Sequence, residues 1–191
     1  FRVALRTLGV LLLAYTLVAA IAGKDVVINP VFGMFYVLLW VGLVPASLLL
    51  GPVWKAISPL RTWNVAVARL VRTDPEQGLF SYPERLGYWP AAAGLLSFVW
   101  MELVFPRADE LGPVRLWIAC YLAVLLVGGV LFGHRFNEHA DPFEVFSTLV
   151  ARMSPWARLD GELVVRSPLA NLASTPERPG LVAVVAVIHW V

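Results

Sequence analysis

Charged residues are scarce in this chain. Of its 191 residues, 15% are charged and 59% are hydrophobic, whereas a soluble domain has about 25% and about 45–50%. The mean hydropathy of +0.75 is typical of integral membrane proteins. The net charge of +2 is too small to indicate a nucleic-acid partner. The composition therefore excludes an ordinary soluble domain and makes the lipid bilayer the expected partner.

Motifs that name a reaction are also lacking. Cys120 is the only cysteine, which excludes an internal disulfide and a thiolate metal cluster. It lies in an apolar run, where a thiol behaves as a small hydrophobe. Gly-rich phosphate loops, Ser nucleophile elbows and Cys-x-x-Cys pairs are absent from the sequence. Neither a catalytic residue nor a cofactor can therefore be assigned from a motif.

Long uncharged runs dominate what is present. A helix needs about 20 mainly apolar residues to cross a bilayer. We predict an all-α, polytopic transmembrane bundle, a single-domain fragment over residues 1–191. The expected spans are 4–23, 30–54, 88–105, 113–133 and an incomplete fifth at 180–191. Pro45 is expected to kink the second span. A signal peptide is the alternative for the first run, because Arg2 and Arg6 precede it.

The positive residues divide unevenly between the two sides of the predicted spans. Three lie on one side, namely Lys24, Arg107 and Arg115. The other twelve lie before the first span or in the two long connections: Arg2, Arg6, Lys55, Arg61, Arg69, Arg72, Arg85, Arg135, Arg152, Arg158, Arg166 and Arg178. Because cytoplasmic loops carry the excess of Lys and Arg, we expect a cytoplasmic N-terminus in the plasma membrane.

The two long connections resemble each other. Each contains a segment with an N-cap residue followed by proline, Ser58-Pro59 in one and Asp141-Pro142 in the other. Apolar residues then recur at helical spacing, which predicts amphipathic helices at 58–72 and 141–153 in the cytoplasmic membrane interface. Packing against the protein's own bundle would produce the same pattern. A Pro-Glu-Arg turn follows each segment, so we predict a parallel internal repeat.

Five segments carry a family resemblance. They are Trp40–Val44, Gly51–Lys55, Ser58–Thr62, Arg85–Ala91 and Asp141–Val145. Through them the chain resembles a group of actinobacterial multi-pass membrane proteins commonly labelled fenitrothion hydrolase, over most of residues 29–180. The label implies hydrolysis of an organophosphate ester. It brings no agreed catalytic residues, and a man-made substrate cannot be the natural one.

Ionisable side chains gather just after the fourth predicted span. His134 and Glu138 are four residues apart and would share a helix face, and His139 and Asp141 follow. Histidine and carboxylate side chains are ligands for zinc and similar metals. These four residues are therefore candidate metal ligands. The alternative is a polar helix end that meets water and lipid headgroups.

Two further ionisable residues fall inside predicted spans. Glu102 lies near the outer end of the third span, where Arg107 or Arg115 could pair with it. His189 lies near the middle of the fifth. Because ionisable residues within a span are costly and often functional, both are candidates for an intramembrane polar site. The alternatives are an interfacial ion pair for Glu102 and a buried hydrogen bond for His189.

Two functions follow from these observations. The first is non-catalytic: a permease-like protein, or a membrane subunit of a larger complex with other membrane subunits as partners. It rests on the repeat and on the absence of a reaction motif. The second is a membrane-bound, metal-dependent hydrolase of organophosphate-type esters, which rests on the family resemblance and on the segment from His134 to Asp141.

Overall fold

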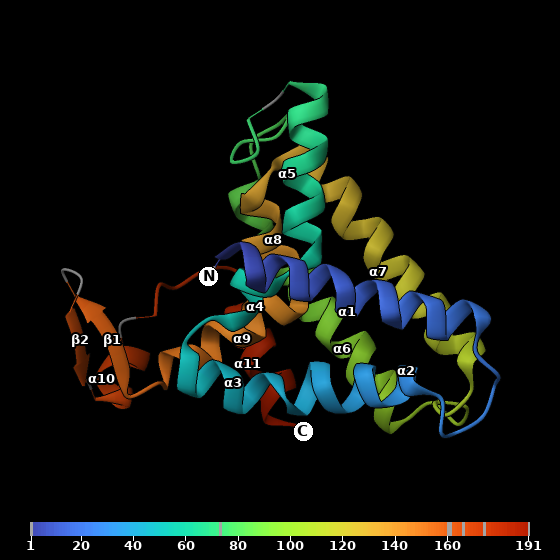
Figure 1. The fold of residues 1–191 in the computed structure, drawn as a ribbon. Helices are drawn as coiled ribbons and strands as arrows, with labels where there is room; N and C mark the ends of the chain where they lie inside the picture. The colour runs from blue at the N-terminus through green and yellow to red at the C-terminus, as the bar shows by residue number, and fades with distance from the viewer. Residues whose placement is uncertain (1, 73, 160–161, 166, 174, 191) are drawn as a thin grey trace.

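The chain folds mainly into helices, shown as a ribbon in Figure 1. The computed structural model describes residues 2–72, 74–159, 162–165, 167–173 and 175–190. The long helices are α1 (Arg2–Ala22), α5 (Pro59–Val71), α6 (Trp89–Leu103), α7 (Leu111–Phe132) and α9 (Pro142–Arg152). The shorter ones are α2 (Pro30–Phe32), η1 (Gly33–Val41), α3 (Leu43–Leu50), α4 (Val53–Ile57), η2 (Glu84–Leu86), α8 (His134–Ala140), α10 (Pro168–Ala173) and α11 (Leu181–His189).

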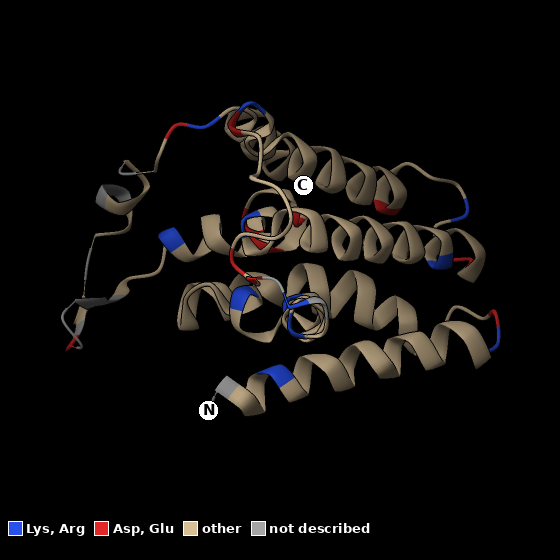
Figure 2. Cartoon of the chain, turned by 90° about the horizontal axis from the view of Figure 1, so that it is seen from above, with Lys and Arg blue, Asp and Glu red and all other residues tan. Residues whose placement is uncertain are grey.

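Three helical stretches in the described part of the chain are long and apolar enough to cross a membrane. They are Val3–Ala22, Pro30–Leu50 and Leu111–Phe132, which coincide with the predicted first, second and fourth spans. Only 11%, 22% and 28% of their most apolar windows are buried inside the protein. Their apolar side chains therefore face outward, which suits lipid and not water. Lys, Arg, Asp and Glu lie mostly near helix ends and in connections (Figure 2).

The predicted third and fifth spans are shorter helices. α6 has 15 residues, a rise of about 22 Å, whereas the hydrocarbon core is about 30 Å thick. α11 has nine residues, and residue 191 of the predicted fifth span lies outside the described residues. The two helices pack against each other. A full crossing by either one stays a prediction.

The second span is not a uniform α-helix. Residues Gly33–Val41 form a π-helix, and α-helix resumes at Leu43. At the junction the Gly42 amide donates to the Val37 carbonyl, five residues back, at 2.8 Å. Pro45 follows this junction and has no N–H to donate to Val41, so an α-helical bond is missing there in any case. The change of helix type lies just before Pro45, and a kink at Pro45 itself stays a prediction.

Both predicted N-caps are confirmed. The Ser58 hydroxyl accepts from the Arg61 amide at 3.5 Å, and the Asp141 carboxylate accepts from the Phe143 and Glu144 amides at 3.0 and 3.4 Å. These caps start α5 and α9. Eight of the eleven residues of α9 are buried, and the helix packs against α3, α4, α6 and α8. α9 therefore lies within the bundle, as in the packing alternative, whereas α5 covers α7 and one end of α1.

An aromatic cluster holds the centre together. Phe98 of α6 is fully buried, and its ring lies 4.9–5.6 Å from the rings of Phe35, Trp40, Trp117 and Phe143. These rings come from η1, α7 and α9, so one side chain joins four elements. Tilted and edge-on pairs of this kind are favourable beyond the area they bury.

The two Pro-Glu-Arg turns meet in space. The Tyr88 amide donates to the Pro179 carbonyl at 2.7 Å, which joins the start of α6 to the start of α11. A Cβ on Gly87 would lie 2.2 Å from the same carbonyl, so glycine permits the close approach. α6 and α11 then run side by side in the same direction.

A small hairpin follows α9 and was not predicted. Strands β1 (Trp156–Leu159) and β2 (Glu162–Val165) are antiparallel, with Trp156 opposite Val165. The hairpin and α10 lie beside the bundle, at the left of Figure 1. The chain is predominantly helical, as expected, but this pair of strands departs from a purely α fold.

Candidate functional site

A cluster of four charged side chains lies where α4, α5, α8 and α9 meet. It consists of Lys55, Arg61, Glu138 and Glu144, and we call it the charged cluster. Arg61 Nε donates to Glu144 Oε2 at 2.7 Å, and Arg61 Nη2 donates to Glu144 Oε1 at 2.5 Å. This two-pronged contact is the geometry that arginine and carboxylate prefer. Its two side chains are only 9% and 2% exposed.

The rest of the cluster reaches toward the surface. Glu138 Oε1 accepts from Lys55 Nζ at 2.5 Å and from Arg61 Nη2 at 3.4 Å. The Lys55 and Glu138 side chains are 46% and 38% exposed. The four groups thus run from a buried pair to a solvent-facing pair, with two positive and two negative charges in balance.

The surroundings favour the charged forms of Arg61 and Glu138. Burial lowers the pKa of Arg61, but the hydrogen bond and charge of Glu144, with help from Glu138, raise it by more, so the net shift is upward. Burial raises the pKa of Glu138, but Lys55 and Arg61 lower it by more, so the net shift is downward. Both shifts favour the ionised forms of Arg61 and Glu138.

Asp141 lies next to the cluster and is fully buried. Its Oδ2 accepts from Trp54 Nε1 at 2.8 Å, and its Oδ1 accepts from the Tyr121 hydroxyl at 3.0 Å, in addition to the two amides of α9. Burial, and then the charge of Glu144, raise the pKa of Asp141 to about 7, while its hydrogen bonds act in the opposite direction. The charged cluster is already balanced, so no positive charge remains for this carboxylate.

Two serines tie the cluster to the second span. Ser147 Oγ lies 2.8 Å from Ser47 Oγ and accepts from the Trp54 amide at 3.2 Å. Both hydroxyls are fully buried. α9 is therefore joined by polar contacts to α3, α4, α5 and α7.

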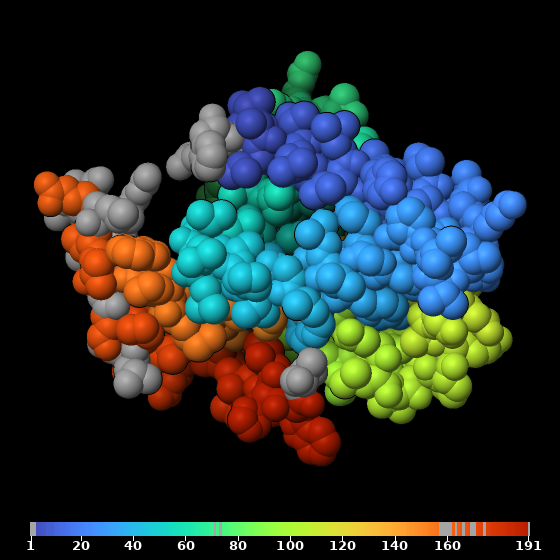
Figure 3. All heavy atoms as spheres, turned by 60° about the horizontal axis from the view of Figure 1, so that its bottom comes forward, coloured from blue at the N-terminus to red at the C-terminus, as the bar shows by residue number. Residues whose placement is uncertain are grey.

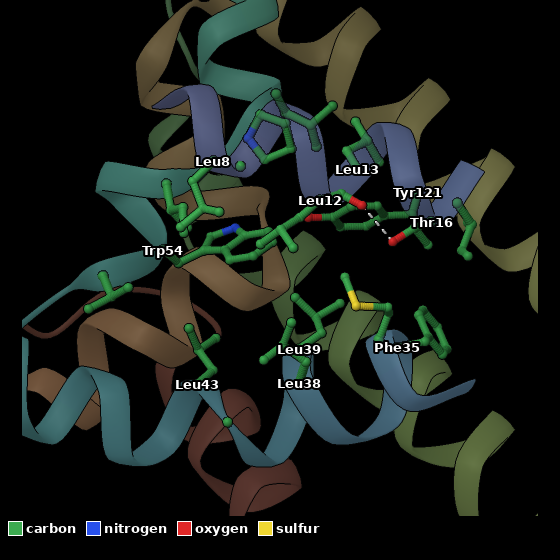
Figure 4. A pocket seen from close by; sticks show the side chains of 18 of the residues that line it. Leu8, Leu12, Leu13, Thr16, Phe35, Leu38, Leu39, Leu43, Trp54 and Tyr121 are labelled. Carbon is green, nitrogen blue, oxygen red and sulfur yellow. Dashed lines mark hydrogen bonds between the residues drawn. The ribbon is translucent and has the colours of Figure 1, made fainter. Parts of the chain in front are cut away.

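An apolar cavity of about 320 Å³ lies beyond Trp54 and Tyr121. Its walls come from α1, η1, α3, α4, α5 and α7, and in Figure 4 the Trp54 and Tyr121 side chains lie across the middle of the view, above Leu38, Leu39 and Leu43. Asp141 thus holds two side chains of the cavity wall from behind. Trp54 and Tyr121 therefore contact Asp141 on one side and line the cavity on the other.

The four candidate metal ligands are not brought together. Glu138 and Asp141 have the partners given above. His139 stacks between the rings of Tyr82 and Tyr88, at 5.3 Å from each, and its Nδ1 lies 2.8 Å from the Arg135 carbonyl. Among the residues that the structure describes, no group of three or more His, Cys, Asp or Glu side chains is placed to hold a metal ion.

His134 is the one candidate with a free buried nitrogen. Its Nε2 lies 4.0 Å from Glu76 Oε1, and within the described residues its buried Nδ1 has no partner. Burial and the nearby Arg61 lower the pKa of His134. The neutral form is therefore favoured. The amide groups of Asn64 and Asn137 are likewise buried without a partner in the described part of the chain.

The two intramembrane candidates lie apart from the charged cluster. Glu102 is on α6, and its buried Oε2 has no hydrogen-bond partner within the described residues. The expected partners are engaged elsewhere, because Arg107 pairs with Glu110 and Arg115 Nε donates to the Ala20 carbonyl. His189, the last residue of α11, is exposed on the protein surface.

Sequence reasoning missed most of the charged cluster. Lys55 and Arg61 were counted only as cytoplasmic charges, yet each contacts an acidic residue 83 positions further along the chain. That offset is the one that aligns Ser58-Pro59 with Asp141-Pro142. The signal was therefore present as opposite charges at equivalent places in two similar segments.

Comparison with known proteins adds no relationship to these observations. No protein-family model, no curated protein and no solved structure matches the chain. The structure supports a mostly helical protein with helices suited to a membrane. Any finer assignment depends on the geometry of the charged cluster and the cavity.

Proposed function

We propose that this chain is a permease-like, multi-pass protein of the plasma membrane, built from two parallel repeat units that interlock at the charged cluster. One observation carries the proposal: Lys55–Glu138 and Arg61–Glu144 both join residues 83 positions apart. Each contact therefore links one position of the first unit to the equivalent position of the second. Parallel repeats related by an axis along the membrane normal are one way in which transporters are built.

The packing of the helices supports the two units. The first unit would run through α3, α4, α5 and α6, and the second through α7, α8, α9 and α11. α5 packs against α7, and α9 packs against α3, so each cap-initiated helix covers the span of the other unit. α6 and α11 meet as equivalent helices. This reciprocal exchange is the pattern of a two-fold contact.

The buried charges favour a protein that changes conformation during transport over a rigid scaffold protein. A buried ion pair contributes little net stability, because desolvation offsets the attraction. Ionisable groups buried beside membrane spans often mark pathways for ions or substrates. The unpartnered amides of Asn64 and Asn137 offer further polar surface close to the spans. In this proposal the cluster faces the cytoplasm, with the N-terminus on the same side.

Access to the buried polar region from each side of the membrane tests the permease proposal. The protein would carry Cys120→Ser, to remove the native thiol, and Asn137→Cys as the only cysteine. A small, membrane-impermeant thiosulfonate would be added outside intact cells and, separately, to inside-out vesicles. We expect modification from both sides, because a permease exposes its polar region alternately.

Val18→Cys is the matched control. Val18 lies on α1 and is 64% exposed on the surface that would face lipid. Its thiol should stay unmodified, since only a thiolate attacks the thiosulfonate and displaces its sulfinate, and hydrocarbon disfavours the thiolate. Modification of Asn137→Cys from the cytoplasmic side alone, or from neither side, would overturn the permease proposal. Stable co-purifying membrane proteins in that case would favour the subunit of a larger complex.

The hydrolase implied by the family resemblance stays a prediction. In the described residues, the candidate ligands His134, Glu138, His139 and Asp141 point to separate partners. Metal analysis of the purified protein separates this reading from the permease proposal. Stoichiometric metal that is lost when His134→Ala and His139→Ala are combined would favour the enzyme.

A further inference from the structure

The cavity beyond Trp54 and Tyr121 lies among the predicted membrane spans. Its walls include residues of Val3–Ala22, Pro30–Leu50 and Leu111–Phe132, the three stretches suited to crossing a bilayer. Figure 3 shows the surface hollowed between α1, in dark blue, and the η1–α3 segment, in lighter blue to cyan. The cavity is therefore bordered by helices whose outer surfaces would touch lipid.

The mouth of the cavity is apolar. Leu8 on α1 and Leu38 on η1 both line it, and they are 46% and 49% exposed. These two leucines are therefore part of both the cavity wall and the outer surface of the protein. In a bilayer the medium in contact with such side chains is lipid acyl chain. An apolar molecule could therefore enter the cavity from the surrounding membrane without passing a polar region.

The interior of the cavity offers little to water. Four of its side chains carry a hydrogen-bond donor, and each donor is already used; the Trp117 Nε1 donates to Ser97 Oγ at 3.0 Å. Thr16 donates to the Leu12 carbonyl at 2.8 Å, and Trp54 and Tyr121 donate to Asp141 at 2.8 and 3.0 Å. A buried water needs two to four polar partners, whereas apolar cavities stay dry and take up apolar molecules.

The size of the cavity limits what can fill it. Its volume is about 320 Å³. One water molecule occupies ~30 Å³ in the liquid, so the cavity has the volume of roughly ten water molecules. A transmembrane helix, with a diameter of about 10–12 Å, is too large. A single hydrocarbon chain fits the volume, the apolar walls and the mouth.

We propose that the cavity bordered by α1, η1, α3, α4, α5 and α7 is a binding site for one acyl chain of a membrane phospholipid. The chain enters between Leu8 and Leu38 and ends against the Trp54 and Tyr121 rings. This site is separate from the charged cluster, so it does not depend on the permease proposal. It does require that the three spans lie in a bilayer.

Two tryptophan variants of α1 test the site. Leu12→Trp fills the cavity, whereas Leu11→Trp, the matched control, adds the same ring to an outer face that is 61% exposed. Each protein would be purified from membranes in mild detergent and examined by native mass spectrometry. We expect one retained phospholipid in the unaltered protein and in Leu11→Trp, with at least a tenfold lower occupancy in Leu12→Trp. Equal occupancy in the two variants, or none in the unaltered protein, would overturn the proposal.

A second measurement does not require the cavity to be filled by a larger side chain. The protein and its Trp54→Phe variant would be placed in bilayers of a phospholipid brominated in mid-chain. The fluorescence difference between them reports Trp54, which lines the cavity. Bromine quenches tryptophan on contact, so we expect the Trp54 contribution to be lost in brominated lipid. A Trp54 contribution that persists at the level seen in unbrominated lipid would contradict an acyl chain in the cavity.

Discussion

Arg61 is the residue on which the charged cluster depends. It holds Glu144 in a two-pronged contact and also reaches Glu138, while being almost fully buried itself. Removing one member of a buried pair leaves the other charged and unpaired, which costs far more than the pair contributes when intact. The stability of the protein should therefore be much more sensitive to single changes here than to removal of the whole pair.

Single and double substitutions measure this difference. We expect Arg61→Met to lower the free energy of unfolding by about 3–5 kcal/mol, measured by denaturant titration in detergent micelles. Arg61→Met combined with Glu144→Met should be more stable than Arg61→Met alone. Arg69→Met is the control on the same helix, since Arg69 is exposed, and should change stability by less than about 0.5 kcal/mol. A double variant less stable than both single variants would contradict this account.

Asp141 should make stability depend on pH. Its pKa is raised from an ordinary 3.8 to about 7 in the folded protein, chiefly by burial. The folded state therefore binds the proton more tightly than the unfolded state does, and the resulting stability is present in acid and lost as pH rises through about 7. Between about pH 5 and about pH 8 this loss should amount to about 2–3 kcal/mol.

Asp141→Asn isolates that contribution. Asparagine keeps an N-cap oxygen but does not titrate in this range. The unfolding temperature of the variant should fall less than that of the unaltered protein between the two pH values. Parallel pH profiles for the two proteins would show that another group is responsible.

At the scale of elements, the contact between α5 and α7 depends on a glycine. A Cβ on Gly129 of α7 would lie 1.9 Å from Nδ2 of Asn64 on α5. Asn64 is buried, so its side chain would have to shift within the α5–α7 contact to admit a methyl group at Gly129. Small residues at such crossings let helices approach closely.

Gly129→Ala should therefore destabilise the protein by about 1–3 kcal/mol, measured by thermal unfolding in detergent. Gly112→Ala is the matched control in the same helix. Nothing lies within 4 Å of a Cβ at Gly112, so alanine there should be neutral or stabilising by up to about 1 kcal/mol. If both variants behaved alike, the close approach of α5 and α7 would be in doubt.

The helix starts were predictable from the sequence where neighbouring residues alone determine them. Ser58 and Asp141 start helices because an oxygen acceptor followed by proline suits a helix N-terminus. Asp141 and Glu144 have the spacing of a capping box, but the Glu144 carboxylate accepts from Arg61 and not from the Asp141 amide. A long-range partner outcompeted the local one. The hairpin with Trp156 opposite Val165 was missed although Asp160-Gly161, a dipeptide typical of two-residue hairpin connections, separates its two strands in the sequence.

At the scale of the whole molecule, hydrophobicity was the most informative property. The three long apolar stretches follow from composition alone, because hydrocarbon accepts only satisfied backbone and apolar side chains. The charged cluster did not follow, since Lys55 and Glu138 are far apart in the chain and meet only through tertiary packing. The cavity likewise depends on how the spans diverge, which hydropathy does not record.

The sidedness of the whole protein can be measured with surface cysteines. In the Cys120→Ser background, Gln77→Cys and Glu177→Cys report the two long connections, and Asp109→Cys reports the opposite side; all three positions are exposed. The excess of Arg and Lys predicts that the long connections lie in the cytoplasm. An impermeant maleimide on intact cells should therefore label Asp109→Cys only. Labelling of either long connection from outside would reverse the predicted orientation.

The charge pattern of the cluster has a consequence for how such a protein could have arisen. Both basic members, Lys55 and Arg61, come from the first segment, and both acidic members, Glu138 and Glu144, come from the second. A self-pairing ancestor with a single segment would have set lysine against lysine and arginine against arginine at the same places, which like-charge repulsion disfavours. In the two-unit proposal, the present pairing is therefore open only to two copies that have diverged. Duplication of the segment would then have preceded the appearance of these charges, and neither half could replace the other.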